Sequence, residues 1–286
     1  MAARRSKRGG PPGATTQAQK PPPAPIITLT TDFGSRDPFI GIMKGVMLGI
    51  APAARLVDLT QAVPAHNVVA GAHLLRSAVP WFPTGTIHVA VVDPGVGTRR
   101  RALVIETADA YFVGPDNGLL SLAAPARSVR RIIDVSRSPH RLQPVSRTFH
   151  GRDVFAPIAA ALASGVAPER LGHVLGSMRR LRTARVRRRG GSLFGEVLWV
   201  DGFGNLVTNV TRADLVAAGF RGRGLSTTIG RHVAPFRPSY AGVPEGHPLA
   251  LVNSSHRLEI AVNCGSAADQ LGAGPGSRVR VEMARA

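Results

Sequence analysis

One segment, residues 86–100, constrains the fold more than any other part of this chain. Residues 86–92 are rich in β-branched apolar side chains, and the run stops abruptly at Asp93, which proline and glycine follow. This pattern is typical of a buried strand that ends in a tight loop. Open α/β sheets bind ligands just beyond the carboxyl ends of their strands, so Asp93 and the nearby Arg100 are candidate ligand contacts. An ordinary strand exit with solvated arginines is the competing interpretation.

Strand-like and helix-like segments alternate through the first part of the chain. The strand-like runs are residues 26–31, 55–59 and 86–92, and the stretches of helical apolar periodicity are residues 39–50 and 67–79. Alternation at these spacings is typical of an α/β sheet. We therefore expect an N-terminal α/β domain with a mostly parallel central sheet at residues 25–178.

The composition changes after this domain. An arginine-rich run ends in two glycines, and we interpret residues 179–191 as a linker. Residues 192–286 contain short strand-like runs with frequent glycine and proline, which indicates a smaller, mainly antiparallel β domain. Residues 1–24 are basic and rich in proline and glycine without apolar periodicity, so we expect a disordered tail.

The formal net charge of +19 raises the question of a nucleic-acid partner. Most of the excess positive charge lies in the tail and in the linker, and aromatic residues make up only 5% of the chain. Proteins that bind exposed bases stack them on aromatic side chains. We therefore expect no dedicated nucleic-acid partner.

Cysteine usage and hydropathy indicate the compartment. The single cysteine, Cys264, excludes an intramolecular disulfide, and no CxxC or HxxxH spacing suggests a structural metal. No window approaches the ~18 consecutive apolar residues of a membrane-spanning helix. The basic N-terminus lacks the apolar segment of a signal peptide. We expect a cytoplasmic protein with no membrane partner and no metal site.

Five short motifs occur in order along the chain. They are TDFG at 31–34, DPGVGTRR at 93–100, GPDNG at 114–118, FHGRD at 149–153 and DGFGN at 201–205. Together they resemble the S-adenosyl-L-methionine (SAM) hydrolase family, also called SAM hydroxide adenosyltransferases, to which fluorinase and chlorinase are related. The resemblance covers about residue 26 to the C-terminus. It implies an α/β domain followed by a β domain, and a homotrimer that binds SAM between the N-terminal domain of one subunit and the C-terminal domain of its neighbour.

The resemblance also implies roles for individual residues. By position, Asp93, Arg100 and His150 match the set that marks the hydroxide-using branch, and Asp32 matches the carboxylate that holds both ribose hydroxyls. The other substrate contacts it implies are Phe203, Asn205 and the backbone near Cys264 for adenine, and Asp201, Ser254 and an assisting Asp37 for methionine.

Other positions bear on which branch the chain resembles. Halide-using relatives carry Tyr where Asp93 stands, Thr at Val96 and Ser at Gly151, together with a longer insertion near residues 107–111; this chain has none of these features. Ser255 stands where some relatives have Arg, which weakens the expected carboxylate contact. The expected activity is hydrolysis of SAM to adenosine and L-methionine without a cofactor. A halide adenosyltransferase and a non-catalytic SAM- or adenosine-binding protein are the alternatives.

The implied chemistry is attack by water at ribose C5′. The sulfonium leaves as a neutral thioether, so no general acid is needed, whereas the water must be oriented and deprotonated. Asp93 can accept the proton or hold the water, Arg100 can stabilise developing hydroxide, and His150 can complete the hydrogen bonds. The sequence leaves open which group takes the proton.

Overall fold

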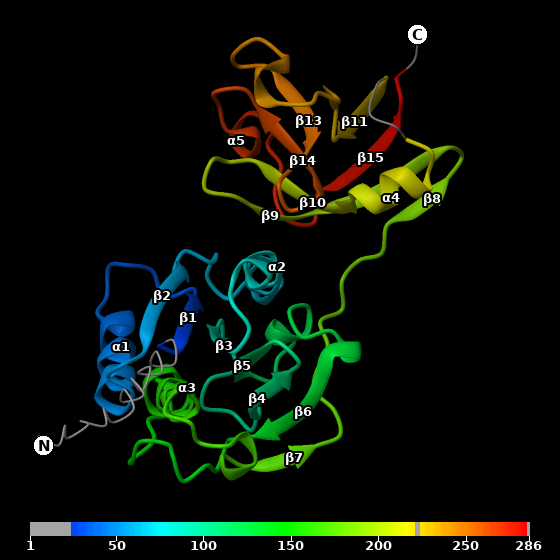
Figure 1. The fold of residues 1–286 in the computed structure, drawn as a ribbon. Helices are drawn as coiled ribbons and strands as arrows, with labels where there is room; N and C mark the ends of the chain where they lie inside the picture. Colours follow the sequence, from blue (N-terminus) through cyan, green and yellow to red (C-terminus); the bar gives the residue numbers. More distant parts are fainter. Residues whose placement is uncertain (1–23, 221–223, 285–286) are drawn as a thin grey trace, which may run out of the picture.

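The structure is a computed structural model, and it describes residues 24–220 and 224–284. The expected disordered tail covers residues 1–24, of which residues 1–23 lie outside the described residues. The chain builds two halves, one around a seven-stranded sheet and one around an eight-stranded sheet (Figure 1).

The sheet of the N-terminal half has the order β2-β1-β3-β5-β4-β6-β7. Its strands are β1 (Ile26–Thr31), β2 (Arg55–Thr60), β3 (Thr86–Val91), β4 (Ala102–Thr107), β5 (Ala110–Pro115), β6 (Val129–Asp134) and β7 (His173–Leu175). The pairs β1–β2, β1–β3 and β3–β5 are parallel, whereas β4–β5, β4–β6 and β6–β7 are antiparallel. The sheet is therefore mixed, and the expectation of a mostly parallel sheet is too strong. The tight hairpin between β4 and β5 reverses the strand direction, which only antiparallel neighbours permit.

Helices cover both faces of this sheet. Helix α1 (Phe39–Ile50) and helix α3 (Ala156–Ala163) pack on one face, and α2 (Val68–Ala78) packs on the other. Figure 1 shows α2 on the side that faces the C-terminal half. Helix α2 begins where Asn67 caps it, because the Asn67 side chain accepts a hydrogen bond from the amide of Ala70 at 2.9 Å. The short helices are η1 (Val79–Trp81), η2 (Leu119–Ser121), η3 (Ala126–Ser128), the π-helix η4 (Gly151–Phe155), η5 (Pro168–Arg170) and η6 (Tyr240–Gly242).

The C-terminal half is an antiparallel sheet of order β12-β11-β15-β9-β10-β14-β13, with β8 paired to β9. Its elements are β8 (Arg187–Arg189), β9 (Ser192–Val200), β10 (Leu206–Thr211), α4 (Arg212–Ala217), β11 (Leu225–Ile229), β12 (His232–Pro235), β13 (Pro248–Val252), β14 (Arg257–Val262), α5 (Ala267–Leu271) and β15 (Arg278–Met283). The expected mainly antiparallel β architecture is confirmed. Residues 187–189 differ from the expected linker, because they pair with β9 as strand β8.

The two halves share a hydrophobic core. Ala72 and Leu75 of α2 belong to the same buried cluster as Leu198 and Trp199 of β9 and Val207 of β10. Helix α2 is thus packed on one side by its own sheet and on the other by the C-terminal half. Among the described helices, none is long and apolar enough to cross a membrane.

Candidate functional site

Asp93 follows the carboxyl end of the central strand β3. Val91 and Val92 are buried, and the loop that follows turns back where the amide of Val96 donates to the carbonyl of Asp93 at 3.1 Å. The Asn117 side chain donates to the carbonyl of Val92 at 2.8 Å, which fixes the strand end from the neighbouring 114–118 motif. Asp93 is therefore held in place on both sides.

Asp93, Arg100 and His150, which we name the reaction cluster, are in direct contact. Arg100 Nε donates to both carboxylate oxygens of Asp93, at 2.9 and 3.0 Å, and Arg100 Nη2 forms an ion pair with Asp93 and donates to His150 Nδ1 at 2.8 Å. The exposed fractions of the Asp93 and Arg100 side chains are only 4% and 9%. The structure thus brings together all three residues that the sequence predicts to be catalytic.

The contact with Arg100 fixes the tautomer of His150. A guanidinium has only donors, so His150 Nδ1 accepts and the neutral ring carries its proton on Nε2. Burial lowers the pKa of His150 below its ordinary value of 6.5, and the charge of Arg100 lowers it further, although Asp93 and Asp153 act in the opposite direction. His150 is therefore a neutral imidazole with an N–H donor at Nε2.

The loop that carries His150 is held by close packing. His150 immediately precedes η4, a π-helix, which is a form enriched at functional sites. A Cβ at Gly151 would lie 2.9 Å from Met43 Sδ and 3.2 Å from the Phe149 ring, so a side chain there would displace the loop. The Phe149 ring in turn packs edge-on against Phe33, with 6.2 Å between ring centroids. This packing joins the His150 loop to the 31–34 motif.

Asp32 lies at the same end of the sheet as Asp93, beyond the carboxyl ends of β1 and β3. Strands β1 and β3 are adjacent and parallel, with Thr31 opposite Val91, so the residues that follow them emerge side by side. Asp32 Oδ2 accepts a hydrogen bond from the amide of His66 at 2.9 Å. Asp37 is exposed in the loop before α1. Asp32 and Asp93 thus emerge at the same end of the N-terminal sheet.

The 201–205 motif forms a tight turn between β9 and β10. Asp201 Oδ1 accepts from the amides of Phe203 and Asn205, at 2.8 and 2.9 Å, and Asp201 Oδ2 accepts from Asn205 Nδ2 at 3.0 Å. Asn205 is buried, whereas the Phe203 side chain is 82% exposed. Asp201 therefore shapes a turn that presents an aromatic ring to the outside.

Cys264 and Ser254 lie at opposite ends of β14. The Cys264 end adjoins the 201–205 turn, because the amide of Ala268 donates to the carbonyl of Gly204 at 2.9 Å and a Cβ at Gly204 would lie 2.2 Å from Ser266 Oγ. Ser254 is in the hairpin before β14, about 20 Å away along a six-residue strand. The structure thus groups Cys264 with the 201–205 turn and separates Ser254 from it.

Two residues near the reaction cluster were not among the site residues that the sequence predicts. The guanidinium carbon of Arg100 lies 5.3 Å from the centroid of the Phe155 ring, and Asp153, 2% exposed, accepts a hydrogen bond from the amide of Ser146 at 2.8 Å. The FHGRD motif contains Asp153 but not Phe155, and both contacts depend on how η4 packs.

The N-terminal and C-terminal candidates form two separate groups within one chain. In the described residues, no hydrogen bond or ion pair joins the reaction cluster to the 201–205 turn, Ser254 or Cys264. The described residues also contain no group of three or more His, Cys, Asp or Glu side chains arranged to hold a metal ion.

Comparison with known proteins identifies the family. Residues 27–172 match the N-terminal domain of SAM hydroxide adenosyltransferases, and residues 195–280 match their C-terminal domain. A protein from Salinispora tropica named (R)-S-adenosyl-L-methionine hydrolase is 40% identical over 264 residues, covering 91% of this chain and 98% of that protein. A fluorinase from an Actinoplanes species is 27% identical over 271 residues, covering 84% and 91%. The crystal structure of an uncharacterized conserved protein from Thermotoga maritima has a TM-score of 0.83 and 35% identity, covering 90% of this chain and 99% of that one. Because both domains match in order and together span most of the chain, this protein belongs to the SAM hydroxide adenosyltransferase family.

Proposed function

We propose that this protein hydrolyses SAM to adenosine and L-methionine. The observation that carries the proposal is the nearly buried reaction cluster at the end of β3, in which Asp93, Arg100 and His150 are mutually hydrogen-bonded. The Salinispora tropica relative, which carries a SAM hydrolase name, covers most of the chain at higher identity than the fluorinase does.

The reaction needs a positioned water more than it needs an acid. An oxygen–C5′ bond forms and the C5′–sulfur bond breaks, and its electron pair leaves with sulfur as the neutral thioether of methionine. One proton of the water must be removed. The reaction uses no cofactor, since SAM supplies its own leaving group.

The tautomer of His150 supports a division of roles within the reaction cluster. The His150 lone pair at Nδ1 is taken by Arg100, so its Nε2–H donates to the water oxygen rather than accepting a proton. Asp93 is an acceptor, and we assign to it the proton of the water. Arg100 links the two residues and stabilises the negative charge that develops between them.

The substrate contacts follow the two groups of candidates. We assign Asp32 to the ribose hydroxyls, and Phe203, Asn205 and the backbone near Cys264 to adenine. Ser254 and Asp37 are assigned to the methionine part. Asp201 is assigned there too, although its carboxylate also holds the 201–205 turn.

The direct test is an assay for products. Purified protein incubated with SAM in water is expected to release adenosine and methionine in equal amounts, as measured by chromatography. Because the Salinispora relative is named for the (R)-form, both sulfonium epimers are tested, and the (R)-epimer is expected to react. Formation of a 5′-halo-adenosine with added chloride or fluoride would favour the halide reaction, and binding of SAM without turnover would exclude an enzyme of this kind.

We further propose that the protein is a homotrimer whose sites lie between subunits. The separation of the two groups within one chain supports this arrangement, because a second copy then supplies the adenine side. Phe203 is 82% exposed in the isolated chain, so its ring is available to a ligand or to a second subunit. We place the reaction in the cytoplasm on the basis of the single cysteine.

Mixed trimers test the shared sites. Asp93→Ala impairs the N-terminal side of a site and Phe203→Ala the C-terminal side, so each homogeneous variant is expected to be nearly inactive. In a three-fold ring, every mixed trimer has one intact site, and doubly tagged trimers from co-expression are expected to show about one third of the wild-type activity. Mixed trimers no more active than either parent, or a fully active monomer by light scattering, would contradict the arrangement.

A further inference from the structure

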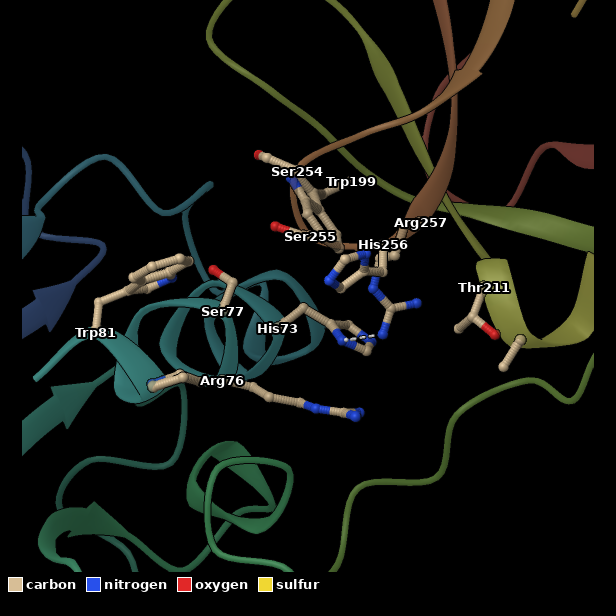
Figure 2. Close-up of a pocket in the computed structure, with 12 residues that line it drawn as sticks. His73, Arg76, Ser77, Trp81, Trp199, Thr211, Ser254, Ser255, His256 and Arg257 are labelled. Atoms are coloured by element: carbon tan, nitrogen blue, oxygen red, sulfur yellow. Dashed lines mark hydrogen bonds between the residues drawn. The ribbon is translucent and has the colours of Figure 1, made fainter. Parts of the chain in front are cut away.

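A cavity lies between α2 and the C-terminal half. It has a volume of about 760 Å³, a size typical of small-molecule sites. Figure 2 shows that His73, Arg76 and Trp81 come from the N-terminal half. They face Ser255, which lies in the hairpin before β14, and Arg257, which is the first residue of β14. We call this cavity the interdomain cleft.

The interdomain cleft carries positive charge without a counter-charge. Arg76 and Arg257 both line it, no acidic residue lines it, and neither guanidinium forms an ion pair with a carboxylate of the described residues. Burial and, to a smaller extent, the charge of Arg76 lower the pKa of Arg257 to about 10, and the charge of Asp214 partly opposes this. The cleft therefore places the partly buried Arg257 near a second cation, the exposed Arg76, and the two charges repel each other.

His73 adds an unused donor to the interdomain cleft. Its side chain is 5% exposed, and its Nδ1 lies 3.1 Å from Arg257 Nη2, so Nδ1 accepts and Nε2 carries the proton. His73 Nε2 has no hydrogen-bond partner among the described residues, although a buried donor without a partner is costly. Burial and the charges of Arg257 and Arg76 lower the pKa of His73 to about 3, so the ring remains a neutral donor. The missing partner is an acceptor.

Aromatic rings complete the lining. Trp199 stacks on the His73 ring, with 5.5 Å between centroids and 23° between planes, and fixes that donor in place. Trp81 lines the cleft from the N-terminal half and is 82% exposed, so its flat apolar ring is available to a ligand. We propose that the interdomain cleft binds a phosphate monoester that carries a flat ring, of the nucleoside monophosphate class.

The parts of such a ligand match the parts of the cleft. A phosphate dianion supplies acceptors for Arg76 and Arg257, and guanidinium–phosphate pairs are strong because they are charge-assisted. A heteroaromatic ring stacks on Trp81, as bases stack on aromatic side chains.

The cleft is distinct from the reaction cluster. Helix α2 starts next to His66, which contacts Asp32 at the carboxyl end of β1, and Trp81 ends η1 just before β3 begins. Trp81 therefore lies at the opposite end of the sheet from Asp93. Only Ser254, at the cleft's rim, belongs also to the proposed SAM contacts, so the proposal does not rest on the proposed function.

Intrinsic fluorescence reports on this cleft directly, because both tryptophans of the chain, Trp81 and Trp199, line it. Guanosine monophosphate is the probe, since a base other than adenine avoids the proposed adenine contacts. We expect a saturable change in tryptophan fluorescence, with the same Kd by calorimetry. Guanosine, which lacks the phosphate, and inorganic phosphate, which lacks the ring, are each expected to bind at least tenfold more weakly.

Variants locate the binding. Arg76→Ala is expected to raise the Kd for guanosine monophosphate about tenfold to a hundredfold through loss of a charge-assisted hydrogen bond. Arg278→Ala, which removes an exposed arginine in a different groove, and Asp93→Ala are expected to leave the Kd unchanged. Equal binding by Arg76→Ala and wild type, equal affinity for guanosine and the monophosphate, or no binding at all would overturn the proposal. A cleft covered by a second subunit would also overturn it, and would appear as fluorescence that changes with dilution but not with the probe.

Discussion

Asp93→Ala is expected to lower the turnover of SAM by at least 10²-fold and up to about 10⁴-fold, the usual contribution of a positioned base. Arg100→Ala is expected to do the same, because Arg100 holds both Asp93 and His150. Initial rates of adenosine release measure the loss, and thermal melting checks that the fold is retained. Asp93 sits with only 4% of its side chain exposed, so its substitution acts on the site rather than on the surface charge.

Matched variants separate chemistry from stability. Removing Arg100 leaves a nearly buried carboxylate without its partner, which costs about 3–5 kcal/mol in comparable buried pairs. Arg100→Lys keeps the charge but loses the forked geometry, and we expect it to recover stability more than turnover. Arg99→Ala, at the exposed neighbouring position, is the control and is expected to leave the rate unchanged. Near-wild-type rates in Asp93→Ala would exclude Asp93 as the proton acceptor.

The second large effect is loss of stability in mild acid. His88 is 1% exposed, contacts Thr28 Oγ1 through Nδ1 at 2.8 Å and stacks on Phe112, and burial lowers its pKa to about 4. The pKa of His73 is lowered to about 3. Both rings are neutral in the folded protein and titrate near 6.5 in the unfolded chain. Their contribution is therefore fully present above pH 6.5 and is lost as the pH falls from 6.5 towards 4 and 3.

The size of this loss follows from proton linkage. Each unit of pH below 6.5 favours the unfolded state by about 1.4 kcal/mol per histidine, so each costs about 2 kcal/mol at pH 5 and the pair about 4 kcal/mol. Urea unfolding at pH 7.5 and at pH 5.0 measures the difference. Asp153, whose pKa is lowered from its ordinary 3.8, stays ionised at both pH values of this measurement and does not contribute to the difference between them.

A single substitution tests the assignment to histidine. His88→Gln keeps a polar side chain beside Thr28 and removes the titration, so the difference between the two pH values is expected to shrink by about half. An unchanged pH dependence in His88→Gln, or equal free energies of unfolding of the wild type at both pH values, would refute this explanation.

Local signals made much of the fold predictable. The end of β3 at Asp93 and the helices at residues 39–50 and 67–79 all depend on neighbours in sequence, and the structure has them within a residue or two. The mixed order of the N-terminal sheet depends on pairing between distant strands, which periodicity does not encode. The pairing of residues 187–189 with β9 was missed for a related reason, since three consecutive arginines carry no apolar alternation.

The candidate site divides in the same way. The motif resemblance identified Asp93, Arg100 and His150, and the structure brings them into contact. The contact of Phe155 with Arg100 arises only from the packing of η4, so no local sequence pattern predicts it. The separation of Ser254 from the 201–205 turn depends on the length and direction of β14, which become visible only once the strand is paired.

The position of α2 limits how this architecture can be divided. Because Leu75 on one side and Leu198 and Trp199 on the other belong to one buried cluster, each half covers part of the apolar surface of the other. A chimera that joined the sheet of one relative to the β half of another at the glycines near residue 190 would leave α2 between mismatched neighbours. Halves can therefore be exchanged among relatives only together with the residues that face α2. The structural boundary between the halves lies at α2, whereas the chain passes from one half to the other near residue 190.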